Sequence, residues 1–156
     1  MKSRKSIIKN IFERHGEDAI YVTPTGYISR AVWEIIGDKN NIFYMNGSMG
    51  LSPAIGLGIS LNTDRDVIVL SGDASLLMHL GITHTIRDYS KDNYYLYILD
   101  NNSHESVGNH ECSHLEDSYP GVTEIIKINC EGKTPRVTIS FEKNAKQIRN
   151  FLSENE

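Results

Sequence analysis

Two apolar runs, each followed at once by polar residues, constrain the fold of this 156-residue chain more than any other feature. Val67–Leu70 leads into Ser71-Gly72-Asp73, and Tyr94–Leu99 leads into Asp100-Asn101-Asn102. Apolar runs without polar alternation are typical of strands buried on both faces, as in parallel sheets. The 28 positions from Asp73 to Asn101 leave room for a connecting helix, which we expect from about residue 75 to residue 88.

The side chains that follow these two strands indicate a magnesium–diphosphate site. Ligands of open α/β sheets bind beyond the carboxyl ends of the strands, and Mg²⁺ prefers oxygen ligands. We therefore predict that Asp73 and Asn101 are metal ligands, with the backbone carbonyl of Ser103 as the third. Gly72 is expected to allow a sharp turn, and Ser75 to open a helix whose free N–H groups face the phosphates.

In the rest of the chain, predicted strands also alternate with predicted helices. This pattern predicts a single α/β domain over residues 1–156, with a three-layer α/β/α arrangement around a parallel sheet. Ser29 is expected to cap one helix, and Asp100 to stabilise the loop beside Asn101. Further helices are expected over 6–14, 29–36, 51–61 and 144–153, further strands over 19–22, 42–45, 125–128 and 137–141, and a loop over 103–121. In the helix over 51–61, Gly56, Gly58 and Ser60 are expected to allow close packing.

Composition excludes several function classes. The net charge is −4 and the only basic run is Lys2–Lys5, so nucleic acid is not an expected partner. The longest apolar runs are too short to cross a bilayer, so no membrane association is expected. Two cysteines, Cys112 and Cys130, without a signal peptide, predict free thiols and a cytoplasmic location.

The motif around the two strand ends also resembles a known family. Gly72-Asp73-Ala74-Ser75 with Asn101 at this distance resembles the thiamine diphosphate motif, usually Gly-Asp-Gly followed by Asn. Further blocks resemble the diphosphate-binding domain of phosphonopyruvate decarboxylases and of the related sulfopyruvate decarboxylases. These blocks are residues 25–30, 47–52 and 101–108. The resemblance implies that thiamine diphosphate and Mg²⁺ are the cofactors.

The resemblance also implies roles for single residues. Met49 corresponds to the wedge that bends the cofactor into a V, and Gly47 to the carbonyl that holds its 4′-amino group. His104 falls in the active site, where a histidine could balance an anionic substrate or shuttle a proton. Thr25 is either a contact of the diphosphate or a simple turn residue. The implied cofactor-binding set is Thr25, Gly47, Ser48, Met49, Gly72, Asp73, Ala74, Ser75, Asn101, Ser103 and His104.

The activity implied by the resemblance is decarboxylation of a small anionic 2-keto acid. We expect 3-phosphonopyruvate as the substrate, as in phosphonate biosynthesis, with a sulfopyruvate decarboxylase beta subunit as the alternative. Family members need a pyrimidine-binding domain that supplies a catalytic glutamate. We therefore expect a separate pyrimidine-binding subunit and a hetero-oligomer whose active site lies between the chains.

Three departures keep other functions open. The third motif glycine is Ala74, the usual Gly-Gln after Val-Gly is Asn109-His110, and the region after about residue 108 is shorter than in the family. A catalytically silent thiamine diphosphate-binding module therefore stays an alternative, as does a nucleotide- or phosphate-binding domain that uses the same strand ends. The cluster over residues 110–114 could hold zinc, whereas His79 and His84 are expected on a helix surface.

Overall fold

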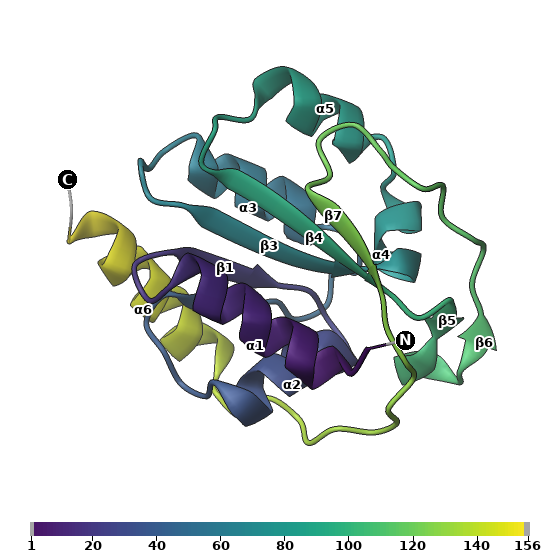
Figure 1. Ribbon diagram of the computed structural model, residues 1–156. Coiled ribbons are helices and arrows are strands. Elements are labelled where there is room, and N and C mark those ends of the chain that lie inside the picture. Colours follow the sequence, from purple (N-terminus) through teal and green to yellow (C-terminus); the bar gives the residue numbers. More distant parts are fainter. Residues whose placement is uncertain (1, 155–156) are drawn as a thin grey trace.

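The computed structural model describes residues 2–154 and shows a parallel sheet between two layers of helices (Figure 1). The predicted three-layer α/β fold is confirmed. The helices are α1 (Arg4–His15), α2 (Tyr27–Ile35), α3 (Ser52–Ser60), α4 (Asp73–Met78), α5 (Ile82–Tyr89) and α6 (Phe141–Ser153), with a short 3₁₀ turn over Glu105–Val107. The strands are β1 (Ile20–Thr23), β2 (Ile42–Tyr44), β3 (Val67–Gly72), β4 (Tyr94–Asp100), β5 (Ser103–His104), β6 (His110–Glu111) and β7 (Glu124–Lys127).

The main sheet has the spatial order β2-β1-β3-β4-β7, and every neighbouring pair is parallel. The chain adds β2 on one side of β1 and then places β3, β4 and β7 on the other side. The winding direction therefore reverses between β1 and β3. At such a point the loops after the two strands leave toward opposite faces, and the crevice between them is the usual ligand site of open α/β sheets.

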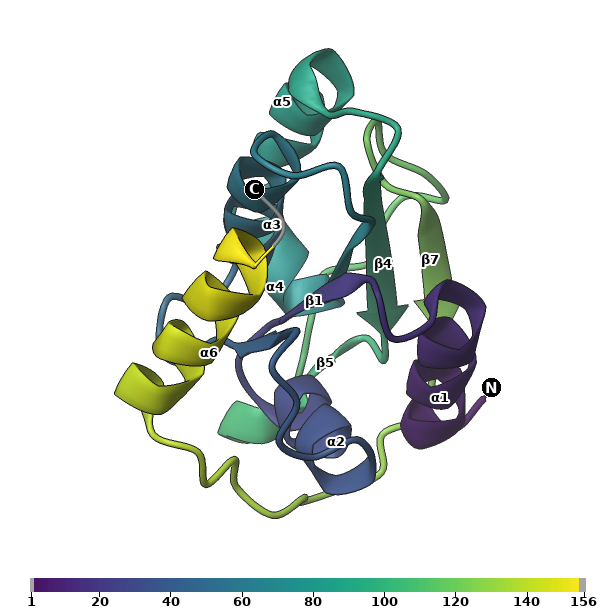
Figure 2. The same cartoon turned by 90° about the vertical axis from the view of Figure 1, so that its left-hand side faces the viewer.

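Helices cover both faces of the sheet (Figure 2), and each face has its own apolar core. On one face α1 and α2 pack through Ile7, Ile8, Ile11, Ala31 and Val32. On the other face α3, α4 and α5 pack through Leu57, Leu76 and Ile86. Along β3, Ile68 and Leu70 belong to the first core, whereas Val67 and Val69 belong to the second. The strand therefore has no solvent face, which explains its uninterrupted apolar run.

Helix α6 protects the edge of the sheet at β2. The side chain of Asn144 accepts a hydrogen bond from the Tyr44 N–H at 2.9 Å and donates one to the Ile42 carbonyl at 2.7 Å. These two backbone groups lie on the outer side of the edge strand, where unpaired groups would otherwise invite pairing with another chain. The helix begins after Ser140, whose side chain accepts from the Lys143 N–H at 3.2 Å.

Most predicted helix ends lie within three residues of those in the structure, but two predictions about helices are wrong. The helix predicted over 75–88 is two helices, because the backbone leaves the helical conformation at His79 and α5 begins only at Ile82. The prediction that Ser29 caps a helix is wrong, because α2 begins at Tyr27 after Gly26, which has φ +82°. Ser29 is instead buried inside α2, and its hydroxyl lies 3.1 Å from that of Thr23.

The C-terminal third contains one of the two predicted edge strands. The strand over 125–128 is confirmed as β7, which pairs with β4 at the sheet edge. The strand over 137–141 is wrong, because this segment is irregular and Phe141 already begins α6. Val137 and Ile139 nevertheless pack against the first core, so their alternation reflects half-burial without strand pairing.

The two glycines of α3 provide a test of how this helix packs. A Cβ on Gly56 would lie 2.2 Å from Val69 Cγ2, whereas a Cβ on the exposed Gly58 would meet nothing within 4 Å. We expect Gly56→Ala to destabilise the chain by roughly 1–3 kcal/mol through overpacking. Gly58→Ala should instead stabilise it by about 0.5–1 kcal/mol, because alanine favours the helix.

Urea unfolding of both variants measures the difference. Equal effects of the two substitutions would contradict the assigned packing of α3 on β3. The expectation that both glycines allow close packing is already wrong for Gly58, since it faces solvent.

Candidate functional site

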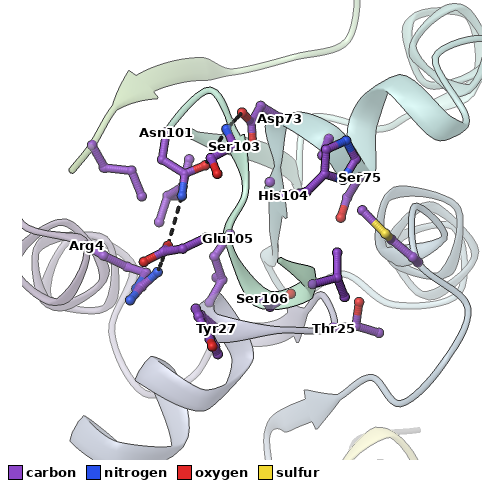
Figure 3. Close-up of a pocket in the computed structure, with 17 residues that line it drawn as sticks. Arg4, Thr25, Tyr27, Asp73, Ser75, Asn101, Ser103, His104, Glu105 and Ser106 are labelled. Atoms are coloured by element: carbon purple, nitrogen blue, oxygen red, sulfur yellow. Dashed lines mark hydrogen bonds and ion pairs between the residues drawn. The ribbon is translucent and has the colours of Figure 1, made fainter. Parts of the chain in front are cut away.

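A small cavity lies at the carboxyl ends of β1, β3 and β4, at the point where the winding reverses (Figure 3). Its volume is about 60 Å³. The segments that follow these three strands form most of its wall, and Met49 comes from the loop after β2. Arg4 of α1 and Ile128, directly after β7, close one side. The lining residues are Arg4, Thr25, Tyr27, Ile28, Met49, Gly72, Asp73, Ala74, Ser75, Leu99, Asn101, Ser103, His104, Glu105, Ser106, Val107 and Ile128.

The side-chain oxygens of Asp73 and Asn101 converge at this cavity. The pairing of Gly72 with Leu99 brings the ends of β3 and β4 level, so the residues that follow them meet. The backbone N–H of Ser103 donates to Asp73 Oδ2 and to Asn101 Oδ1, at 3.2 Å each. Both oxygens therefore face one common point, the Ser103 N–H, and Figure 3 shows the two side chains on either side of Ser103.

The carboxylate of Asp73 is buried and has no ion-pair partner among residues 2–154. Burial raises its pKa from 3.8 to about 6. The backbone N–H of Ala74 opposes this shift, and the neighbouring Asp100 adds to it. Asp100 itself has a cationic partner, because its carboxylate binds the ammonium of Lys127, and it also accepts from the Asn102 N–H at 2.9 Å. An uncompensated buried carboxylate beside an amide oxygen is a donor set that fits a small divalent cation.

The other residues predicted to form the magnesium–diphosphate site also lie at the cavity, but not all in the expected way. Ala74 and the buried Ser75 line it, on a helix that begins at Asp73 and not at Ser75 as expected. Gly72 also lines it, but with φ −95° its backbone is extended, so the predicted sharp turn through glycine is wrong. The hydroxyl of Ser103 donates away from the cavity to Asn109 Oδ1 at 3.0 Å. Its carbonyl as a third metal ligand stays a prediction.

The loop between β2 and α3 brings only one of its predicted residues into the cavity. Met49 lines the cavity, whereas Gly47 and Ser48 lie on the exposed part of the loop, with φ of +63° and +51°. Gly50 holds this loop against α4, since a Cβ there would lie 2.7 Å from the Ser75 carbonyl. Thr25 and His104 also line the cavity. The cofactor contacts predicted for these residues stay predictions.

Sequence reasoning missed several residues of the cavity wall. Glu105 and Ser106 stand inside a block that carried the family resemblance, so their spacing from Asn101 was an available signal. Tyr27 likewise stands in the block after β1. Arg4 carried no such signal, because it lies in a basic terminal run and reaches the cavity only through the packing of α1.

The predicted alternative of a zinc site over residues 110–114 is not supported. Within the described residues 2–154, no group of three or more His, Cys, Asp or Glu side chains is placed to hold a metal ion. Cys112 is buried, and burial raises the pKa of its thiol to about 11, which disfavours the thiolate that zinc binds.

No helix of the described residues has the length and apolar character needed to cross a bilayer.

Comparison with known proteins gives one consistent family. The family model described as "Thiamine pyrophosphate enzyme, C-terminal TPP binding domain" matches residues 24–148. Sulfopyruvate decarboxylase subunit beta of Methanocaldococcus jannaschii is 40% identical over 97% of this chain and 78% of that protein. The chain belongs to the thiamine pyrophosphate enzymes. Its relatives within them are sulfopyruvate and phosphonopyruvate decarboxylases, as the resemblance predicted.

Other relatives differ in how much of their length is matched. Phosphonopyruvate decarboxylase of Streptomyces viridochromogenes is 36% identical over 68% of this chain but only 26% of its own length. A solved structure of a putative thiamin diphosphate-dependent enzyme from Mycobacterium smegmatis superposes with a TM-score of 0.62 at 17% identity, over 74% of this chain and 24% of that one. This last likeness supports the thiamine pyrophosphate enzyme fold.

In this family member, Asp73→Asn tests the electrostatics of the site. The substitution removes a buried charge, so we expect the metal-free chain to gain roughly 1–3 kcal/mol of stability near pH 7.5. The gain should vanish below about pH 3, where Asp73 is protonated in both the folded and the unfolded chain. It should grow as the pH rises from 3.8 to about 6, and stay level above that.

Urea unfolding across this pH range is the measurement, with Asp64→Asn on the exposed surface as the control. A variant less stable than the parent near pH 7.5 would show that the carboxylate is not held in an unfavourable environment.

Proposed function

We propose that this chain is the diphosphate-binding subunit of a thiamine diphosphate-dependent 2-keto acid decarboxylase, with Mg²⁺ as its metal. The observation that carries this proposal is that the Asp73 and Asn101 oxygens converge on the Ser103 N–H, while the buried Asp73 carboxylate has no ion-pair partner among residues 2–154. In the proposed complex Asp73 and Asn101 hold the metal, and Ser75 and Thr25 contact the diphosphate. The family match supports the cofactor, because the matched domain is named for binding it.

The size of the cavity supports a site that is completed by another chain. Pockets for small molecules usually measure roughly 300–1,000 Å³. The cavity of about 60 Å³ suits the metal and the phosphate end of the cofactor, while the two rings must lie against a further surface. Val107 lines this cavity and is 64% exposed, and Phe141, equally exposed, lines a second cavity that shares Thr25. Exposed apolar residues beside a ligand site suit a partner surface.

We propose that this partner is a pyrimidine-binding subunit and that the enzyme is a hetero-oligomer. The name "subunit beta" of the relatives from Methanocaldococcus jannaschii and Methanococcus maripaludis supports this assembly. The phosphonopyruvate decarboxylases match over about a quarter of their length or less, so in those proteins most of the chain lies outside the matched region.

The proposed substrate is a three-carbon 2-keto acid with a second anionic group at carbon 3. Sulfopyruvate is the first candidate, because a sulfopyruvate decarboxylase subunit matches almost the whole chain. Phosphonopyruvate, the substrate expected from the sequence blocks, is the second. When bound, thiamine diphosphate supplies a carbon nucleophile and an electron sink for the decarboxylation. The chain itself would anchor the diphosphate through the metal held by Asp73 and Asn101, and would pack Met49 against the bound cofactor.

The proposal is tested by an assay of the reconstituted enzyme. The chain is co-expressed with a candidate pyrimidine-binding subunit, and release of carbon dioxide from sulfopyruvate and from phosphonopyruvate is measured with thiamine diphosphate and Mg²⁺. We expect turnover of at least one substrate, and its loss in Asp73→Asn. A complex that binds thiamine diphosphate but turns over neither substrate would favour the silent module, for which Ala74 is the supporting observation. Displacement of thiamine diphosphate by ATP would instead favour a nucleotide-binding domain.

Met49→Ala separates anchoring from catalysis. The side chain lines the cavity from a loop that contributes no metal ligand, so diphosphate binding should be largely retained. Misplacement of the reacting ring should lower kcat by roughly 10- to 100-fold. Calorimetry of cofactor binding and steady-state kinetics measure the two effects, and equal losses in both would count against a role in orienting the cofactor.

A further inference from the structure

We propose that Glu105 is a positioning residue whose carboxylate orients the side-chain amide of Asn101, so that the amide oxygen faces the metal. The inference rests on the proposed magnesium–diphosphate site. It concerns a side chain that makes no contact with the common point of the Asp73 and Asn101 oxygens and acts only through Asn101 (Figure 3).

The carboxylate of Glu105 is surrounded by hydrogen-bond donors. Its Oε2 accepts from Asn101 Nδ2 at 2.9 Å and from Arg4 Nη1 at 2.8 Å. Its Oε1 accepts from the backbone N–H groups of Glu131 and Gly132, at 2.9 Å and 2.6 Å. The side chain is only 7% exposed, so water does not compete strongly for these sites.

This arrangement decides which end of the Asn101 amide faces the metal. The oxygen and the NH₂ group of an asparagine side chain have nearly the same shape, so packing alone does not select between two orientations. A carboxylate can only accept hydrogen bonds, and it therefore requires the NH₂ group of Asn101 on its side. The amide oxygen is then left to face Asp73 and the Ser103 N–H. In the opposite orientation an NH₂ group would point at the cation.

Glu105 can impose this choice because it is itself held from two distant parts of the chain. Arg4, at the start of α1, is 1% exposed, and its guanidinium lies 5.6 Å from the centre of the Tyr27 ring. Arg4 also donates its backbone N–H to Glu131 Oε1 at 2.9 Å. Gly132 has φ +77°, which turns the segment after β7 so that two successive N–H groups point at Glu105.

The consequence is that the metal ligand on β4 depends on α1 and on the segment after β7. Arg4 lies outside residues 24–148, the part of the chain that the family model matches. Affinity for the metal is therefore coupled to the docking of α1, which contributes no ligand of its own. Residues that orient metal ligands typically contribute 10- to 100-fold to metal affinity.

Glu105→Gln tests the inference with little change in shape. Both ends of the Glu105 carboxylate face donors, so the glutamine must turn its own NH₂ group toward one of them. We expect the Mg²⁺ concentration for half-maximal thiamine diphosphate binding to rise roughly 10- to 100-fold. At saturating Mg²⁺ the affinity for thiamine diphosphate should recover. Calorimetry on the full chain in its complex with the pyrimidine-binding subunit gives both values, and Mn²⁺ binding followed by electron paramagnetic resonance gives the metal affinity independently of turnover.

Two comparisons separate orientation from general damage. Glu111→Gln makes the same chemical change at an exposed acid on the nearby strand β6, and it should leave the Mg²⁺ requirement unchanged. In an Asn101→Asp background the ligand has an oxygen at both ends and needs no orientation. There Glu105→Gln should weaken Mg²⁺ binding much less, or strengthen it by removing a neighbouring negative charge. An equal loss in both backgrounds would overturn the proposal, even if Glu105→Gln also lowers the melting temperature.

The outcomes distinguish this inference from the proposed function. If the parent chain binds thiamine diphosphate only with Mg²⁺, and Glu105→Gln has the same Mg²⁺ requirement, the positioning role fails and the proposed function stands. If the parent chain in its complex shows no Mg²⁺-dependent binding of thiamine diphosphate, the proposed function fails, and the positioning role fails with it.

Discussion

The register between β3 and β4 is the constraint on which the rest of the site depends. Six successive residue pairs, from Val67 with Tyr94 to Gly72 with Leu99, determine where the two strands end relative to each other. Because side chains alternate between the two faces, a shift of one residue would move every apolar side chain of β3 into the wrong core. The same packing therefore secures the core and brings Asp73 and Asn101 to a common point.

Two buried carboxylates at the ends of β3 and β4 are electrostatically unfavourable for the folded chain. Asp73 and Asp100 are both buried and close enough for Asp100 to raise the pKa of Asp73. Lys127 on β7 forms an ion pair with Asp100, whereas Asp73 is left without a cation among the described residues. A charge held in this way is unfavourable for the folded chain alone and favourable once a cation binds. Ligand sites commonly trade stability for function in this manner.

Much of the fold, and the two main residues of the candidate site, can be predicted from local sequence. The uninterrupted apolar runs identified β3 and β4 and the parallel sheet, because strands covered on both faces cannot show polar alternation. The motif residues Asp73 and Asn101 were found from their position directly after those strands. The boundaries of helices were less secure. The break after α4 and the irregular segment over 137–140 depend on what each segment packs against, and the local sequence pattern does not record this.

The sequence by itself determined the sheet, the strand ends that carry the site and the family to which these motifs point. Only the tertiary structure decided which side chains complete the site. Arg4 and Glu105 stand 101 positions apart and meet because α1 packs beside the end of β4. Exposure of Gly47 and Ser48 was likewise decided by how their loop rests on α4. Contacts between distant segments depend on the packing of whole elements, and no short stretch of sequence contains that information.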